Sequence, residues 1–524
     1  MASMRCLSLC FAGVLSTFPA FAALQEPVRT ETGPLRGMTG SDPAVVAFRG
    51  IPFAAPPVGD LRWRAPKPAA RWSGVRRADR FGASCIQAIV EERKPWTYEF
   101  MTHTPISEDC LYLNVWTAAQ SAGEKRPVFV WLHGGGYTEG SGAVPVYDGE
   151  RLARRGLVVV TVNYRLGVFG FLAHPELTKE SDHRASGNYG TLDQIAALQW
   201  VQMNIAAFGG DPGRVTIAGQ SAGASSVHNL VASPLAKGLF HRAIAESGSG
   251  VTSNNRTVTL EEAERAGLKF AESRGAKSIA ALRAISWQDL VSGTRTGNAS
   301  SFRPIVDGWV LPESPESRIA HGLQNDVPTL TGLNADEGSS AADYGMVPAA
   351  DFTQQVRKRS GELADDFLNL YPFGSDQEAG AMEKTSAREQ GLVSMYLWAA
   401  HRSRTAKTKV FTYYWTHAEP GPDQQRYAAF HTSEVPYVFD TLHESKRPWT
   451  DGDHKLAELL GSYWFNFAAS GDPNGAGLPP WPAFTDKQAQ TMELGDHAGP
   501  RPIASKEKMA FFSRYFSSVA VKAR

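Results

Sequence analysis

One stretch of sequence, VTIAGQSAG at residues 215–223, decides the fold that we expect. An apolar, β-branched run leads directly into a serine that has a glycine two residues to each side, and a helix-like segment of small and apolar residues follows. A turn between strand and helix at this point is so sharp that side chains at 219 and 223 would collide with neighbouring backbone. The pattern predicts that Ser221 projects from a tight bend as a nucleophile.

A second glycine-rich segment, HGGG at 133–136, follows the apolar run 128–132. Positions without side chains let backbone N–H groups approach a tetrahedral oxyanion closely. We expect the amides of Gly135, Gly136 and Ala222 to form such an oxyanion hole. A flexible turn and a phosphate-binding loop are the alternatives, and the second is weak because no G-K-[ST] follows.

Short apolar runs rich in β-branched residues recur along the chain. Several are apolar at every position, as is required of strands covered on both faces. Helical patterns separate them, most clearly at 192–208. This alternation predicts an α/β fold with a mainly parallel central sheet flanked by helices. The predicted strands are 128–132, 157–162, 215–218, 243–245, 329–333 and 410–414.

Two long stretches, 255–300 and 351–406, interrupt the alternation. Their apolar spacing predicts helices at 261–273, 351–370 and 386–404. We expect these large helical insertions to lie around the active-site gorge, although they could equally serve as bulk packing. No repeat, low-complexity tract or linker divides residues 23–524, so we expect a single domain.

The acid of a catalytic triad in this kind of fold follows the nucleophile in the chain, and the histidine follows the acid. Glu337 lies in the loop after the predicted strand 329–333, where catalytic groups sit in doubly wound sheets. We assign it as the acid that orients the histidine. Asp336 and Asp307 are rivals for this role.

The base is expected in a later loop, after the predicted strand 410–414. His431 lies in such a loop and would take the proton from Ser221 and return it to the leaving alcohol. His443 and His454 lie not far beyond, so position alone leaves the choice of histidine open.

The N-terminus and the cysteines point to export. Residues 1–22 combine Arg5, a short apolar run and Ala20-Phe21-Ala22, which predicts a signal peptide and a periplasmic or extracellular protein; a buried strand or helix is the alternative. After its removal only Cys85 and Cys110 remain. An even count in an oxidising compartment suggests one disulfide, with two free buried thiols as the alternative.

Composition excludes several classes of protein. The chain has 53 basic and 53 acidic residues, so no global field would attract nucleic acid. After residue 22 no apolar run is long enough to cross a bilayer, so we expect no membrane span. No H-E-x-x-H or comparable ligand cluster suggests a metal-dependent hydrolase, and we expect neither a metal nor a cofactor.

The sequence resembles the type-B carboxylesterases, a family of the α/β-hydrolase fold that includes cholinesterases and para-nitrobenzyl esterases. The resemblance spans nearly the whole chain after residue 22. Its motifs are FRGIPFAAPPVGDLRW at 48–63, SEDCLYLNVW at 107–116, HGGGY from 133, NYRLGVFGFL from 163, GNYGTLDQIAALQWVQ from 187 and FGGDPGRVTIAGQSAG from 208.

The resemblance implies the triad of Ser221, Glu337 and His431. It also implies the disulfide between Cys85 and Cys110. It further implies that Ser247 supports the acid, and Glu434 is expected to brace the histidine loop.

The activity implied is hydrolysis of a small-molecule carboxylic ester through an acyl-enzyme on Ser221. A non-catalytic adhesion module on the same fold is the alternative.

The cholinesterase branch of the family binds quaternary ammonium with a tryptophan in the loop that the disulfide closes. Trp96 lies in this loop, but its offset from Cys110 differs from that pattern, so choline specificity is unsupported. The sequence predicts neither the physiological ester nor the oligomeric state, and the sequons at 255–257 and 298–300 matter only in a eukaryote.

Overall fold

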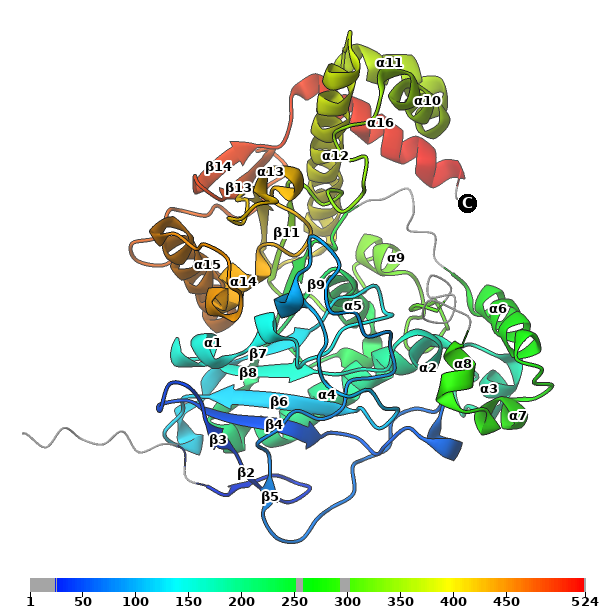
Figure 1. The fold of residues 1–524 in the computed structure, drawn as a ribbon, viewed down its shortest axis with the longest axis vertical. Helices are drawn as coiled ribbons and strands as arrows, with labels where there is room; N and C mark the ends of the chain where they lie inside the picture. The colour runs from blue at the N-terminus through cyan, green and yellow to red at the C-terminus, as the bar shows by residue number, and fades with distance from the viewer. Residues whose placement is uncertain (1–23, 25, 251–257, 293–301, 523–524) are drawn as a thin grey trace, which may run out of the picture.

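The centre of the molecule is an eleven-stranded sheet in the order β14-β13-β12-β11-β10-β9-β7-β8-β6-β4-β3 (Figure 1). The structure is a computed structural model that describes residue 24 and residues 26–250, 258–292 and 302–522. Neighbouring strands run parallel from β8 across to β13, and the pairs at the two edges are antiparallel. This topology confirms the predicted α/β fold with a mainly parallel sheet.

Each predicted strand is present, most of them slightly longer than expected. The strands of the large sheet are β3 Met38–Thr39, β4 Val46–Pro52, β6 Tyr112–Thr117, β7 Arg126–Leu132, β8 Val158–Val162, β9 Gly210–Gln220, β10 Arg242–Glu246, β11 Thr329–Asn334, β12 Val410–Trp415, β13 Gln490–Leu494 and β14 Gly499–Pro502. A small separate sheet contains β1 Val28–Arg29, β2 Pro34–Arg36 and β5 Arg76–Arg77.

The strand β7 shows why the sheet needs apolar residues at every position. Val128, Val130 and Leu132 face one hydrophobic cluster, whereas Phe129 and Trp131 face a second one on the opposite side. All of these side chains are fully buried. Because side chains alternate between the faces of a strand, a sheet covered on both faces must be apolar throughout.

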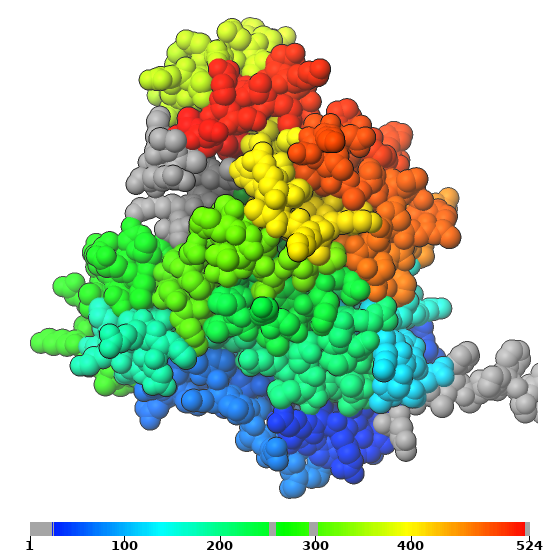
Figure 2. Space-filling view, turned by 180° about the vertical axis from the view of Figure 1, so that it is seen from behind, coloured from blue at the N-terminus to red at the C-terminus, as the bar shows by residue number. Residues whose placement is uncertain are grey.

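Helices supply the two covers. The helices α4 (Tyr189–Asn204) and α5 (Ala222–Ala232) pack on the first cluster, and α1 (Glu150–Arg154) and α15 (Asp451–Ser470) pack on the second. From behind, the middle third of the chain, coloured teal to green, covers the centre of the molecule (Figure 2). The sheet is thus the middle layer of three.

The helical insertions differ in detail from the prediction. The stretch 351–370 is two helices, α10 (Ala349–Ser360) and α11 (Ala364–Leu370), because Gly361 adopts a φ of +55° and ends the first. The helix α12 (Asp376–Thr405) begins ten residues before the predicted start at 386, because the Ser375 side chain accepts a hydrogen bond from the Glu378 amide and caps it there.

The other helices lie around this frame. They are α2 Gly167–Phe171, α3 Pro175–Glu180, α6 Leu260–Ser273, α7 Ile279–Ala284, α8 Trp287–Val291, α9 Pro315–Ala320, α13 Gln424–Tyr427, α14 Val435–Phe439 and α16 Lys506–Lys522. Figure 1 shows α6, α7 and α8 on one side of the molecule, and α10, α11 and α16 together at one end.

The cysteine prediction is confirmed, because Cys85 and Cys110 form a disulfide. The predicted signal peptide and the sequons at 255–257 and 298–300 lie outside the described residues. Within the part of the chain that the structure describes, no helix combines the length and apolarity needed to span a membrane.

Candidate active site

The bend at Ser221 joins the end of β9 to the start of α5. Ser221 has a φ of +59°, which is strained for a residue with a side chain and is characteristic of functional sites. Its amide donates to the Glu246 carbonyl at 2.9 Å. A methyl group at Gly223 would lie 2.0 Å from the Leu132 carbonyl oxygen, and one at Gly219 would lie 2.6 Å from the same atom. The neighbouring backbone therefore requires glycine at both positions.

The HGGG segment lies directly against this bend. A methyl group at Gly134 would meet the Gln220 carbonyl oxygen at 2.8 Å and Ser221 Cβ at 3.2 Å. Gly135 and Gly136 have φ values of +98° and +62°. Their amides donate no hydrogen bond to any other residue that the structure describes. These N–H groups are available to an oxygen atom bound beside Ser221.

Ala222 follows Ser221 directly in the chain. It is the first residue of α5, where a backbone N–H has no partner within the helix. The positive end of the helix dipole lies there as well, which favours negative charge. The three predicted amides thus belong to two segments that meet at Ser221.

The loop after β12 brings His431 to Glu337, which follows β11. His431 Nδ1 is hydrogen-bonded to Glu337 Oε2, and Glu337 Oε1 accepts the Asn334 amide at 2.8 Å. Burial raises the pKa of Glu337, but the charge and hydrogen bond of His431 outweigh it and lower the pKa overall. Burial lowers the pKa of His431, and Glu337 more than offsets this, so that pKa is raised. Each group stabilises the charged form of the other.

Ser247 and Glu434 lie next to this pair. The Ser247 hydroxyl helps to lower the pKa of Glu337 without reaching full hydrogen-bond geometry. Glu434 is completely buried, and its Oε2 accepts the side-chain amide of Asn334 at 2.6 Å. Burial and the charge of Glu337 raise the pKa of Glu434 to about 7.

Sequence reasoning missed Gln220 as a neighbour of the histidine. Its Nε2 lies 3.2 Å from His431 Nε2 and 3.4 Å from Nδ1. The only signal in the sequence is its place immediately before Ser221.

The rival acids have other partners. Asp336 pairs with Arg388 at 2.7 Å and with Lys384 at 3.1 Å. Asp307 accepts hydrogen bonds from the amides of Trp309 and Leu311. Among the described residues neither carboxylate is hydrogen-bonded to the His431 ring, and Asp336 instead accepts the amide of Ala429 at 3.3 Å.

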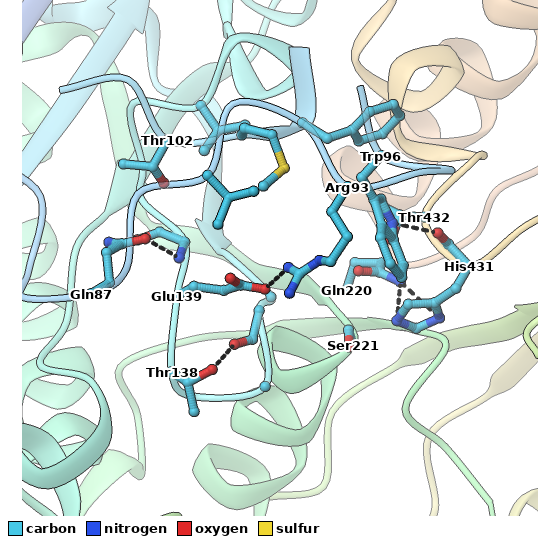
Figure 3. A pocket seen from close by; sticks show the side chains of 18 of the residues that line it. Gln87, Arg93, Trp96, Thr102, Thr138, Glu139, Gln220, Ser221, His431 and Thr432 are labelled. Atoms are coloured by element: carbon cyan, nitrogen blue, oxygen red, sulfur yellow. Dashed lines mark hydrogen bonds and ion pairs between the residues drawn. The ribbon is translucent and has the colours of Figure 1, made fainter. Parts of the chain in front are cut away.

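A pocket of about 450 Å³ opens over Ser221 and His431 (Figure 3). Gln220 and glycines 134–136 also line it, and His443 and His454 do not. We expected its walls to come from the long helical stretches. Instead, among the described residues, one wall is built mainly by residues 87–102, within the loop that the disulfide closes. The stretch 351–406 contributes Trp398 to a second hollow, beside Ser225.

Among the described residues no group of His, Cys, Asp and Glu side chains is arranged to hold a metal ion.

Comparison with known proteins identifies the family. The Carboxylesterase family matches residues 25–512. The chain is 38% identical to a fumonisin B1 esterase of Sphingopyxis macrogoltabida, covering 92% of this chain and 89% of that protein. It is 37% identical to a cocaine esterase of Oryctolagus cuniculus, covering 88% and 90%. It is 35% identical to the para-nitrobenzyl esterase of Bacillus subtilis, covering 89% and 94%. The chain therefore belongs to the carboxylesterase family and is a carboxylic ester hydrolase.

Proposed function

We propose that the protein hydrolyses esters through an acyl-enzyme on Ser221, with His431 as base and acid and Glu337 as the orienting carboxylate. One observation carries the proposal. Ser221, on its strained bend, and His431, hydrogen-bonded to Glu337, line a single pocket beside the HGGG segment.

The first half-reaction forms the acyl-enzyme. Because His431 Nδ1 faces Glu337, the ring carries its proton there and presents Nε2 as a base. Nε2 takes the hydroxyl proton as the Ser221 oxygen bonds to the ester carbonyl carbon. The oxyanion that forms is received by the amides of Gly135, Gly136 and Ala222. The carbon–alcohol bond then breaks, and the imidazolium gives its proton to the leaving alcohol.

The second half-reaction reverses these roles with water. His431 takes a proton from water as its oxygen attacks the acyl carbon, and the proton passes to Ser221 when the acid leaves. The raised pKa of His431 supports this step, because Glu337 stabilises the imidazolium that forms in both halves.

The substrate that we propose is a small-molecule ester. The pocket volume of about 450 Å³ is in the usual range for ligands of that size. The relatives are named for fumonisin B1, cocaine and para-nitrobenzyl esters, which do not narrow the choice further.

Replacement of the nucleophile tests the proposal. Ser221→Ala should lower kcat for 4-nitrophenyl acetate by about 10⁴-fold or more, since no hydroxyl remains to be acylated. Ser517→Ala, at an exposed serine of α16, is the control and should keep full activity. Normal turnover by Ser221→Ala would reject the proposal. The adhesion-module alternative predicts that even the unaltered protein neither turns over esters nor reacts with an organophosphonate.

We also propose that residues 1–22 are removed on export and that residues 23–524 form one domain. The Cys85–Cys110 disulfide supports an oxidising destination. The central sheet takes strands from Met38 to Pro502, which supports a single domain. Mass spectrometry of the secreted protein should find an N-terminus at about residue 23. Intact residues 1–22 on the active protein would contradict the export proposal.

A further inference from the structure

The loop closed by the disulfide, residues 85–110, contacts both halves of the proposed catalytic machinery. We call it the disulfide loop. One of its side chains, Gln87, bonds to the segment that contains the HGGG glycines, and another, Trp96, bonds to the loop that carries His431. Figure 3 shows the two side chains on opposite sides of the pocket.

Gln87 holds the end of the glycine segment by two hydrogen bonds. Its Nε2 donates to the Gly140 carbonyl at 2.8 Å, and its Oε1 accepts the Gly140 amide at 2.8 Å. Gly140 in turn packs closely on the start of the segment, since a methyl group there would lie 2.6 Å from the Gly134 carbonyl oxygen. Gln87 is only 7% exposed, so water replaces these bonds poorly.

A second contact reinforces the first. Arg93 reaches across the pocket and forms an ion pair with Glu139 (Figure 3). The Glu139 amide donates to the Gly135 carbonyl at 3.1 Å, and a methyl group at Gly135 would lie 2.1 Å from the Glu139 carbonyl oxygen. A shift of residues 139–140 would therefore move the Gly135 backbone.

Trp96 holds the histidine from the other side. Its indole Nε1 donates to the His431 carbonyl at 3.0 Å and lies 3.2 Å from Thr432 Oγ1. Thr432 has a φ of +89°, which is strained for a β-branched residue and persists only where neighbouring groups impose it. The indole bond fixes the peptide unit that sets the direction of the His431 side chain.

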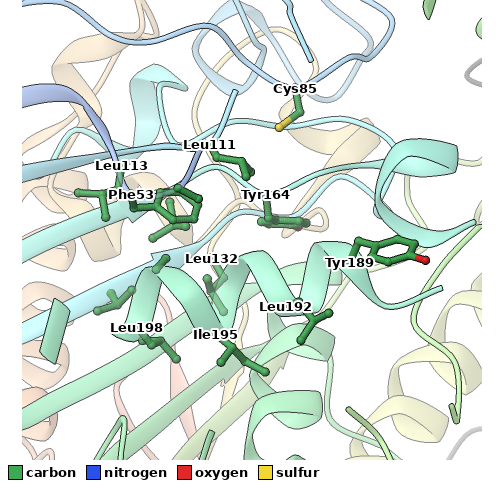
Figure 4. Close-up of a cluster of buried hydrophobic side chains, with 14 of the residues drawn as sticks. Phe53, Cys85, Leu111, Leu113, Leu132, Tyr164, Tyr189, Leu192, Ile195 and Leu198 are labelled. Carbon is green, nitrogen blue, oxygen red and sulfur yellow. The ribbon is translucent and has the colours of Figure 1, made fainter. Parts of the chain in front are cut away.

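The disulfide anchors the loop to the core. Cys85 and Cys110 are 3% and 1% exposed and belong to the buried cluster that contains Leu111 and Tyr164 (Figure 4). The side-chain amide of Asn163 also donates to the Cys110 carbonyl at 3.2 Å. The loop therefore begins and ends at fixed points.

From these contacts we infer that Gln87 and Trp96 are positioning residues: Gln87 holds the amides of Gly135 and Gly136, and Trp96 holds His431, in register with Ser221. The inference rests on the proposed function. It gives Trp96 a task other than cation binding, which the offset of Trp96 from Cys110 did not support.

Gln87→Met tests the first half, because methionine has a similar length but makes neither hydrogen bond. Loosened amides should lower kcat by about 10- to 100-fold while KM changes little, since they act on the oxyanion and not on the bound ester. Affinity for a trifluoromethyl ketone, whose adduct with Ser221 carries an oxyanion, should fall by the same factor. Gln202→Met is the matched control. Gln202 also makes two hydrogen bonds to backbone carbonyls, both at 2.9 Å, and it does not line the pocket.

Trp96→Phe tests the second half, because phenylalanine keeps an aromatic ring in the pocket but has no N–H. A misdirected His431 should lower kcat by about 10-fold, and the weaker bond to Glu337 should move the acid limb of the pH profile to lower pH. Trp72→Phe is the control, since it removes an indole bond of 3.1 Å to the Pro34 carbonyl away from the pocket.

All rates are expressed per active site titrated with an organophosphonate, so unfolded protein does not count. The inference is overturned if Gln87→Met and Trp96→Phe match their controls per titrated site, or if ketone affinity is unchanged when kcat falls in Gln87→Met. Failure of the proposed function is distinct, because it appears as full activity in Ser221→Ala whatever the other variants do.

Discussion

The two sides of the candidate active site are held in place by different means. On the serine side, backbone packs on backbone, with Gly219 and Gly223 so close to the Leu132 carbonyl that no side chain fits. On the histidine side, His431 is held by side chains from separate parts of the chain, namely Glu337, Gln220 and Trp96. The position of Ser221 is therefore inseparable from the fold, whereas we expect that the position of His431 can be changed without unfolding the protein.

The largest effect is expected from a substitution on the serine side. Gly223→Ala would place a methyl group 2.0 Å from the Leu132 carbonyl oxygen and 3.0 Å from that of His133. Neither backbone atom can move without displacing β7, so we expect loss of folded protein or a fall in activity of about 10³-fold or more, with a lower Tm. Thermal unfolding and ester turnover measure both. Gly123→Ala, whose methyl group would meet only Ser121 Oγ at 3.8 Å, should change neither. A normal Tm and normal turnover in Gly223→Ala would contradict the view that backbone packing fixes the serine side.

On the histidine side, Glu337→Gln should lower kcat/KM by about 10²- to 10⁴-fold while the protein stays folded. The pH profile of kcat/KM shows in which direction the pKa of His431 changes. His431 must be neutral to act as a base, and Glu337 raises its pKa by favouring the imidazolium. Removing that charge should lower the pKa, so the acid limb of the profile should move to lower pH.

Asp336→Asn is the control for this prediction, since it removes the neighbouring carboxylate. Asp336 is 1% exposed and pairs with Arg388 and Lys384, so its loss should lower the Tm. The acid limb should stay where it is. If Asp336→Asn shifts the acid limb and Glu337→Gln does not, Asp336 and not Glu337 is the carboxylate that orients His431.

A smaller effect is expected at Gln220, the residue that connects the two sides. Gln220→Glu would put a carboxylate about where the amide nitrogen lies, 3.2 Å from His431 Nε2. A second negative charge should raise the pKa of His431 further, so the acid limb should move to higher pH by about one unit. Gln377→Glu, which adds the same charge at an exposed position of α12, should leave the profile unchanged. An unchanged profile in Gln220→Glu would show that this side chain does not influence the base.

The same division explains what could be predicted from the sequence. The bend at Ser221 depends on glycines within two residues of it, and the strands depend on continuous apolar runs, so both were visible as local patterns. The end of α10 at Gly361 was missed because an apolar helical spacing continues past a glycine whose φ only the folded backbone reveals.

The pocket wall was not predictable in the same way. Gln87 meets Gly140 across 53 positions of the chain, and Trp96 meets His431 across 335. Such contacts depend on tertiary packing, and no periodicity or short motif records them. Glu337 and His431 were predicted as acid and base from their order along the chain and the family resemblance, because Asp336 and His443 are chemically equivalent candidates nearby.

The central claim is that the hydroxyl of Ser221 becomes acylated during turnover. Rapid acid quenching of the protein during hydrolysis of 4-nitrophenyl acetate, followed by peptide mass mapping, tests it directly. We predict one acetyl group, located on the peptide that contains residues 219–223 and specifically on Ser221, and an increased amount of it in Glu337→Gln if water attack is slowed more than acylation. An acetyl group that accumulates on another residue and turns over at the catalytic rate would contradict the account.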